Sequence, residues 1–205
     1  MALLSENDQR KVAEAITRVE RETDAELVTV LAARADSYTY IPLLWAGIIA
    51  LVVPGAINYF PGWLSVHAML LVQWATFIAL SLLFRIPSVT TRLIPRSVRH
   101  WRASNLARYQ FLEQNLHCTE GGTGMLIFVS EAERYVEILV DRGISSRLSD
   151  DTWQSAVEAF TRHVKQGETL EGFLECIDTC GEQLKRHLPA IHERNELPNR
   201  LVILE

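Results

Sequence analysis

Residues 37–84 read SYTYIPLLWAGIIALVVPGAINYFPGWLSVHAMLLVQWATFIALSLLF, and this stretch contains no Lys, Arg, Asp or Glu. Turn-forming residues divide it at Pro54-Gly55 and again between Asn58 and Gly62. Each half, about 41–57 and 63–84, meets the length that a helix needs to cross a bilayer, roughly 17–25 apolar residues. We therefore predict a two-helix transmembrane hairpin within residues 37–85.

The alternative is a helical hairpin that is buried inside a soluble domain. Outside the hairpin and its flanks about 140 residues remain, which is the size of one ordinary domain. A domain of that size has too little core to surround two long apolar helices on all sides. The membrane interpretation is therefore preferred.

Arginine residues follow the second apolar half, and no acidic residue precedes Glu113 on that side. Because Lys and Arg near a span are retained in the cytoplasm, we predict a multi-pass protein of the inner (cell) membrane. Both termini would then be cytoplasmic, with the turn at residues 58–62 on the outside. The basic residues expected to contact anionic lipid headgroups are Arg92, Arg96, Arg99 and Arg102.

The segments on both sides of the hairpin predict the two parts of one cytoplasmic α/β domain, residues 1–36 and 86–188, followed by a C-terminal tail, residues 189–205. Apolar periodicity and capping residues predict a helix that starts after Ser5, and a strand follows from Glu26. Further elements are expected at 97–116 (helix), 124–130 and 135–140 (strand hairpin), 152–165 and 169–187 (helices). The tail ends in an apolar stretch at residues 201–204, and its pattern leaves open whether this stretch docks on the domain.

The sequence also predicts the apolar positions of one helix and the cap of another. The apolar positions of the helix at 97–116 would be supplied by Val98, Trp101, Leu106, Tyr109, Phe111 and Leu112. The helix at 152–165 would be capped by Ser149, Asp150 and Asp151.

The bulk composition limits the classes of partner. The formal net charge is −5, and no basic stripe interleaved with aromatic residues lies outside the segment next to the membrane, so a nucleic-acid partner is not expected. The expected partners are the lipid bilayer and another membrane protein. His67 and Gln73 inside the second span predict an interhelical hydrogen bond or a contact in a homo-oligomer formed through the hairpin.

The cysteines and the acidic residues give the candidate chemistry. Three cysteines, an odd number, in a reducing compartment do not predict structural disulfides, and Cys176 and Cys180 are interpreted as small buried filler of a helix. The best functional cluster is acidic, and carboxylates are the ligands that a hard cation such as calcium prefers. Helix capping is the other interpretation of the aspartates. The candidate metal ligands are Glu26, Asp141, Asp150 and Asp151.

Several phrases of the sequence, in order, resemble those of the TPM domain family. Residues 23–28, TDAELV, resemble the opening TGAEL/IVV of that family. Residues 124–130, GMLIFVS, resemble its strand GVLLxVS, and residues 133–138 resemble its hairpin DRxVxIE. Further matches, which complete the pattern over residues 23–35 and 100–188, are Asp141 to Ile144, Leu148 to Asp150, Trp153, Gly167 and Gly172.

The resemblance implies an α/β (α+β) sandwich of TPM type with an inserted transmembrane hairpin, as in a bacterial membrane-protein branch of the family. TPM domains occur in thylakoid proteins linked to photosystem II repair, in a nematode receptor-associated protein and in bacterial membrane proteins. Weak acid phosphatase activity and calcium binding have been attributed to some members. Most act outside the cytoplasm, and this sequence departs from them in its predicted side and in having Asp24 and Asp141 where the family has Gly.

These observations predict a membrane-anchored, non-catalytic accessory or interaction module that needs no cofactor. The alternative is a metal-dependent phosphohydrolase that uses the four clustered carboxylates and a divalent cation.

Overall fold

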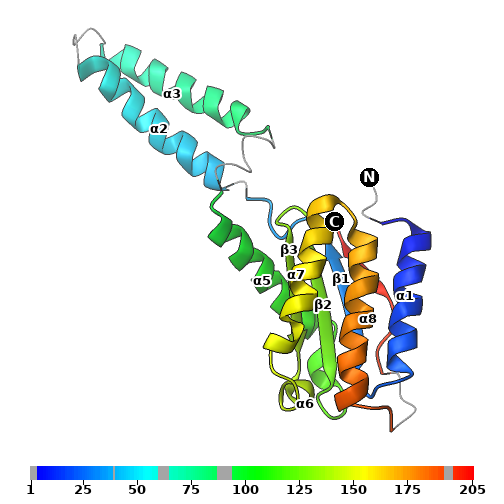
Figure 1. The fold of residues 1–205 in the computed structure, drawn as a ribbon. Coiled ribbons are helices and arrows are strands. Elements are labelled where there is room, and N and C mark those ends of the chain that lie inside the picture. The colour runs from blue at the N-terminus through cyan, green and yellow to red at the C-terminus, as the bar shows by residue number, and fades with distance from the viewer. Residues whose placement is uncertain (1–3, 39, 60–64, 87–93, 192–195) are drawn as a thin grey trace. The chain divides into compact units, whose positions relative to one another are not determined.

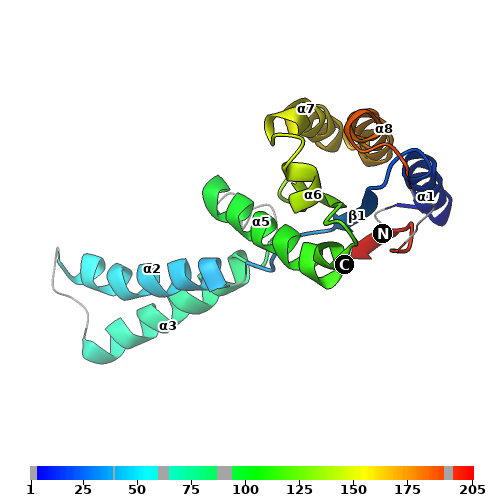
Figure 2. The same cartoon turned by 90° about the horizontal axis from the view of Figure 1, so that it is seen from below.

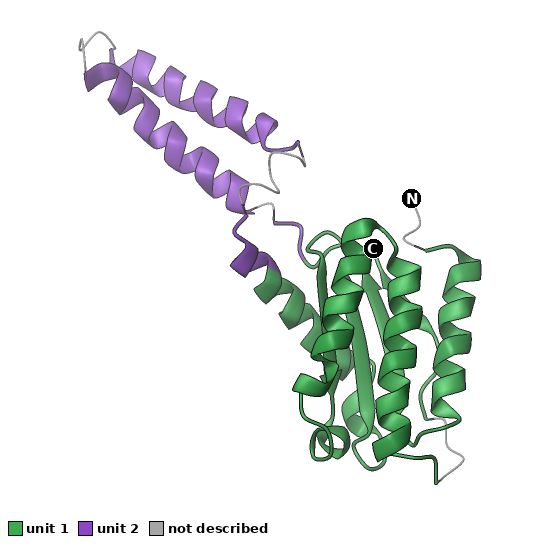
Figure 3. Cartoon of the chain, in the orientation of Figure 1, with its two compact units in different colours: residues 1–35, 100–205 green, residues 36–99 purple. Residues whose placement is uncertain are grey.

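The computed structural model describes residues 4–38, 40–59, 65–86, 94–191 and 196–205. The chain divides into two compact units, which Figure 3 distinguishes by colour. The first unit joins residues 1–35 to residues 100–205, and the second unit holds residues 36–99. The first unit is therefore assembled from two chain segments that the second unit separates in the sequence.

A four-stranded sheet with the strand order β3-β2-β1-β4 organises the first unit (Figure 1). β1 (Glu26–Ala32) and β2 (Gly124–Ser130) are parallel and pair along their whole length, with Glu26 opposite Gly124 and Ala32 opposite Ser130. All residues of both strands are buried, as expected for central strands that are covered on both faces. The predicted mixed α/β fold is thus confirmed.

The two outer strands come from a hairpin and from the chain end. β3 (Tyr135–Val140) is antiparallel to β2, so the predicted strand hairpin is confirmed. β4 (Leu201–Leu204) runs parallel to β1, with Thr29 opposite Leu201. The apolar end of the tail therefore docks on the domain as an edge strand.

Helices α1 (Glu6–Glu20), α7 (Asp151–Gln166) and α8 (Thr169–His187) cover one face of the sheet (Figures 1 and 2). α1 begins as predicted, because the Ser5 hydroxyl accepts a hydrogen bond from the backbone amide of Asp8 at 3.2 Å. Alternate residues of each strand enter this core, since successive side chains of a strand point to opposite faces. From β1 these residues are Leu27 and Leu31.

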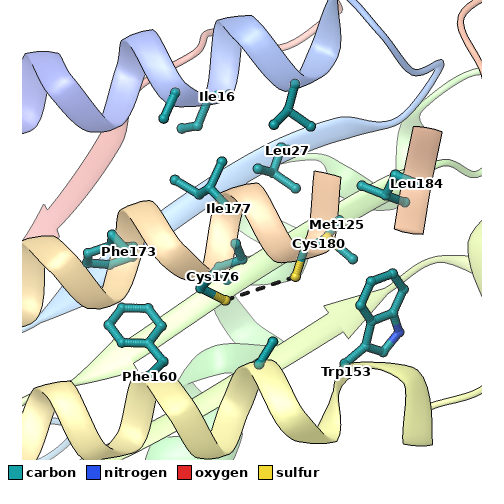
Figure 4. Packing of buried hydrophobic residues seen from close by; sticks show 14 of the residues in the cluster. Ile16, Leu27, Met125, Trp153, Phe160, Phe173, Cys176, Ile177, Cys180 and Leu184 are labelled. Carbon is teal, nitrogen blue, oxygen red and sulfur yellow. Dashed lines mark hydrogen bonds between the residues drawn. The ribbon is translucent and has the colours of Figure 1, made fainter. Parts of the chain in front are cut away.

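The contact between α7 and α8 is closely packed (Figure 4). The rings of Phe160 and Phe173 lie 4.8 Å apart between centroids in an edge-to-face arrangement. The buried sulfur atoms of Cys176 and Cys180 lie 4.0 Å apart on α8, and both thiols are free. The Cys180 sulfur and burial raise the pKa of the Cys176 thiol well above its usual range, which makes it a poor nucleophile and agrees with a packing role.

Helix α5 (Arg96–Glu113) lies against the opposite face of the sheet (Figure 2). Its buried apolar residues are small: Ala103 and Ala107 pack with Val28, Val30 and Phe128 of the strands. Leu106 and Phe111, two of the predicted apolar positions, pack against this second core while partly buried. The prediction of its apolar positions was wrong in part. The exposed large side chains of α5 are Trp101, Tyr109 and Leu112. A large side chain at 103 or 107 would hold the helix away from the strands, so the alanines decide which side of α5 faces the sheet.

Short elements connect the strands and helices at one end of the sheet. The 3₁₀ turn Leu116–Cys118 leads into a turn at Gly121 and Gly122 before β2, which we call the glycine turn. Helix α6 (Arg142–Ser145) follows β3. The Asp141 side chain caps α6 by accepting from the amide of Arg142 at 2.7 Å. The capping prediction for α7 was wrong in one respect, because the side chain of Asp150 makes no capping hydrogen bond there.

The second unit contains helices α2 (Tyr40–Tyr59) and α3 (Val66–Leu83), which pack together. They correspond to the predicted spans 41–57 and 63–84, and α2 continues through Pro54. Residues 60–64 of the predicted turn lie outside the described residues. By length and composition, both helices are apolar enough to cross a membrane.

The surface of α2 and α3 is largely apolar. α2 buries only small or compact residues, Pro42, Ala46, Ala50 and Pro54, and α3 buries none of the residues along its length. His67 is exposed and Gln73 is half-buried on α3, and the homo-oligomer contact predicted for them stays a prediction.

We expect the substitution Gly172→Ala in α8 to destabilise the domain by about 1–3 kcal/mol, the usual cost of forcing extra volume into a packed core. A Cβ atom at this position would collide with the Phe160 ring. Alanine forms helix better than glycine by about 1 kcal/mol, so a neutral outcome would show that the ring can move aside at little cost. Pulse proteolysis of the full chain in detergent over a urea series measures the difference, with Glu182→Ala on the exposed side of α8 as the control.

Candidate functional site

A cavity of about 390 Å³ opens at the end of the sheet where β1 and β2 begin. It lies within the first unit, and its walls come from four separate stretches of the chain. Four acidic residues line it, whereas its basic lining residue is Arg147. The acidic residues are Asp24, Glu26, Glu120 and Glu196. The cavity therefore has a negative lining, which suits a cation or a basic group better than a phosphate ester.

Glu26, the first residue of β1, is only 5% exposed and holds the C-terminal segment in place. One of its carboxylate oxygens accepts from the amide of Glu196 at 2.9 Å, and the other accepts from the amide of Leu197 at 3.2 Å. Burial raises the pKa of Glu26, the two backbone donors oppose this rise, and the charge of Glu196 adds to it. Both oxygens of this carboxylate are thus already engaged in anchoring the tail.

Two of the other acidic residues of the cavity, Asp24 and Glu196, also accept from backbone amides. One oxygen of Asp24 accepts from the amide of Ile191 at 2.9 Å. The carboxylate of Glu196 accepts from the amide of Glu120 at 3.1 Å. These contacts join the segment that follows α8 and the segment that precedes β4 to the loops at the end of the sheet.

Glycine residues let the loops at this end approach one another closely. Gly121 and Gly122 have φ angles of +88° and +64°, which favour glycine. The amide of Gly143 donates to the carbonyl of Gly122 at 2.8 Å, and a Cβ atom on Gly143 would collide with the carbonyl of Gly121. The glycine-rich connector between the 3₁₀ turn and β2 is therefore a tight turn.

The structure brings together only part of the predicted metal site. Glu26 lines the cavity, Asp141 caps α6 beside the glycine turn, and Asp150 and Asp151 lie at the start of α7 and do not line the cavity. Among the residues that the structure describes, no group of three or more His, Cys, Asp or Glu side chains is placed to hold a metal ion. The calcium site at these four acids stays a prediction without support from this geometry.

Sequence reasoning missed the other acidic residues of the cavity. Asp24 lies two residues before β1, and Glu120 lies directly before the glycine turn that leads into β2. Because paired parallel strands begin at the same edge of a sheet, this pattern could have predicted that the two residues lie close together. Glu196 carried no such signal, because its place depends on the docking of the tail.

A second buried carboxylate lies near Glu26, at the end of α1. Glu20 accepts from the amide of Leu27 at 2.8 Å through one oxygen, and its other oxygen is buried with no hydrogen-bond partner among the described residues. The Asn199 side chain interacts with Glu20 and donates to the Thr17 hydroxyl at 3.1 Å. Burial, together with the nearby charge of Glu26, raises the pKa of Glu20 to about 8.

The predicted lipid-facing arginines occupy the start of α5 where they are described. Arg96 and Arg99 lie in the first turn of the helix and Arg102 follows in the next. Arg96 is exposed and the other two are half-buried, whereas Arg92 lies outside the described residues. Their contact with lipid stays a prediction.

Residues 93–183 match the TPM domain. The matched region is slightly less than half of the chain and runs from just before α5 into α8, through β2 and β3. The matched region therefore includes the glycine turn and α6, whereas β1 and β4 lie outside it.

One solved structure supports the fold over a longer range. The NMR structure of the BA42 protein from the psychrophilic bacterium Bizionia argentinensis resembles this chain with a TM-score of 0.62 and 18% sequence identity. The likeness covers 98% of this chain and 96% of that one, and at this identity it shows a shared fold and nothing about activity. No curated protein matches the chain.

We expect the domain to lose stability as the pH rises from about 4.5 to about 8. The pKa of Glu20 rises from its ordinary value of 4.5 to about 8 in the folded chain, so within this window the folded state binds a proton that the unfolded state has released. Glu20→Gln keeps an acceptor for Leu27 and cannot ionise. At pH 8 it should be more stable than the parent by at least about 1 kcal/mol, since one pKa unit is about 1.4 kcal/mol.

Urea midpoints from pulse proteolysis at pH 5, 6.5 and 8 measure this difference. Glu14→Gln on the exposed side of α1 is the matched control and should leave the pH slope unchanged. A slope that is equally steep in the parent and in Glu20→Gln would contradict the assignment.

Proposed function

We propose that this chain is a membrane-anchored protein whose hairpin α2–α3 holds a TPM-like α/β domain at the cytoplasmic face of the inner membrane. In this proposal the domain is a non-catalytic accessory module that binds another membrane protein. The observation that supports the anchor is the apolar surface of the hairpin. Leu51, Leu71 and Trp74 are 70%, 72% and 63% exposed.

The size of this surface supports lipid, and not water, as its surroundings. Sixteen large apolar or aromatic side chains of α2 and α3 are exposed, from Tyr40 to Leu83. Burying one such side chain contributes about 1.5–3 kcal/mol, so leaving them all in water forfeits roughly 20 kcal/mol or more. An ordinary domain has a net stability of only about 5–15 kcal/mol. Hydrocarbon chains are the surroundings that remove this cost.

The orientation rests on the arginine residues after α3 and on the fold of the first unit. Residues 1–35 and 100–205 form one compact unit, so they must lie on the same side of the membrane. A hairpin with two spans satisfies this requirement. The arginines between Arg85 and Arg108 favour the cytoplasmic side.

The accessory role is supported by how the candidate acids are used. Glu26 and Asp141 accept hydrogen bonds from backbone amides and stabilise the tail and α6. Such contacts fix the fold and leave few free ligands for a reaction.

We expect the protein to stay in the membrane pellet after alkaline carbonate washing and to be released by detergent. Its topology is measured with an impermeant maleimide on intact cells. In a Cys118→Ser background, Asn58→Cys should be labelled from outside. Cys118 is exposed in the parent chain and is the matched control, because it should react only after the cells are permeabilised. Recovery of the chain in the soluble fraction, or labelling of Cys118 on intact cells, would contradict the proposal.

The alternative, a metal-dependent phosphohydrolase, is the second proposal, and the observation that favours it is the acidic lining of the cavity, which includes Glu26 and suits a divalent cation. The accessory proposal predicts that the full chain, purified in detergent with calcium or magnesium, shows no turnover of phosphate esters that depends on Asp141 or Asp150. Turnover that is lost in Asp141→Asn or Asp150→Asn would favour the enzyme. The accessory role also predicts a co-purifying membrane protein, and unchanged membrane complexes after deletion of the gene would contradict it.

A further inference from the structure

The exposed side of α5 carries an unusual combination of residues. Successive helical residues are rotated by about 100°, so Trp101, Asn105, Arg108 and Leu112 form one stripe along the helix. Ala103 and Ala107, which pack on the sheet, lie on the opposite side. Trp101, Tyr109 and Leu112 are 58%, 59% and 56% exposed. We call the surface formed by Trp101, Asn105, Arg108, Tyr109 and Leu112 the outer face of α5.

The charges on and around the outer face are mostly positive. Arg108 is exposed on it, and the guanidinium of Arg102 lies 5.0 Å from the centre of the Trp101 ring. No acidic residue occurs between Asp36 and Glu113. Glu113 lies at the far end of the helix, where its hydrogen bond with the Tyr109 hydroxyl raises the pKa of that group.

This combination matches the interfacial zone of a bilayer. Trp and Tyr prefer the headgroup region, and arginine next to them is attracted to anionic lipids. Helices that lie in the interface carry Trp and Leu beside a basic surface. A helix face of this kind is a poor fit to bulk water. At its edge Arg108 and Leu112 line an open cavity together with Leu139 and Val140 of β3.

The chain itself brings the outer face within reach of the bilayer. Only twelve residues, 84–95, connect the end of α3 to the start of α5. Even a fully extended connector of this length spans only about 40 Å, at roughly 3.3–3.6 Å per residue. If α3 crosses the membrane, α5 is therefore tethered close to the surface.

We infer that the outer face of α5 docks on the anionic phospholipid surface, with Trp101 and Leu112 at the headgroup level and Arg102 and Arg108 on lipid phosphates. This inference rests on the proposed membrane anchor. It adds that the domain touches the bilayer through a fixed surface of its own, because the alanines on the opposite side of α5 hold that helix against the sheet.

The test uses the full chain in lipid nanodiscs that contain shallow, spin-labelled quencher lipid. In a Cys118→Ser background, Asn105→Cys places a fluorophore on the outer face. Ser155→Cys, exposed on α7 across the sheet from α5, is the matched control. The lipid quencher should quench the label at 105 at least about twofold more than the label at 155, and more in nanodiscs with anionic lipid than in zwitterionic ones.

Variants separate the docking surface from the fold. Trp101→Ser with Arg108→Gln should reduce the lipid quenching at 105 to the level at 155, while pulse proteolysis shows an unchanged domain. Equal quenching at 105 and 155 in the parent, or quenching at 105 that ignores lipid charge and the two substitutions, would overturn the inference. Failure of the chain to enter nanodiscs at all would instead contradict the membrane anchor on which the inference rests.

Discussion

The parallel pairing of β1 and β2 is the constraint on which the rest of this structure depends. The seven residues of β1 pair with the seven residues of β2, and about ninety residues of chain lie between the two strands. Closing so long a connection costs only modest entropy, because the cost grows slowly with length. The pairing fixes both ends of the connection to one sheet. The residues before and after the connection therefore belong to one domain, independent of the structure of the connection itself.

The connection holds two very different parts, the apolar hairpin and α5. A crossover between parallel strands needs at least one element that returns along the sheet, and α5 fills that role on the second face. The hairpin is additional to it. Its two ends meet the same domain, which is a geometry that an even number of membrane spans satisfies and a single span does not. The TPM match begins at residue 93, after α3, so β1 and the hairpin lie outside it.

Much of the fold could be predicted from the sequence, because its signals are local. The uncharged run fixed the positions of α2 and α3, and continuous apolar stretches predicted the central strands. The errors concern long-range contacts. Trp101 and Leu112 were predicted at apolar positions of their helix by their type, whereas Ala103 and Ala107 are the fully buried positions there. Leu106 and Phe111, which were also predicted, pack against the same core while partly buried. The docking of Leu201–Leu204 depends on an edge of β1 and on Glu26, neither of which is visible in the tail itself.

In the candidate site, too, the sequence predicted what depends on residue type and missed what depends on long-range contacts. Carboxylates suggested a cation site because their residue type permits it, but a sequence does not show which backbone amides will need an acceptor. Glu26 satisfies two such amides in the tail, and Asp141 satisfies one at α6. Glu20 could not be recognised as a group of raised pKa, because its burial and its proximity to Glu26 arise only from the folded chain.

The central claim is that the chain segments before and after the hairpin form one cooperative domain through the pairing of β1 and β2. Hydrogen exchange of the full chain in nanodiscs, followed by mass spectrometry at increasing urea, tests it most directly. The account predicts that amides of residues 27–32 and 125–130 exchange at a common slow rate and lose protection together. Fast exchange in β1 beside slow exchange in β2 would show that the first segment is not part of the domain, and would contradict the account.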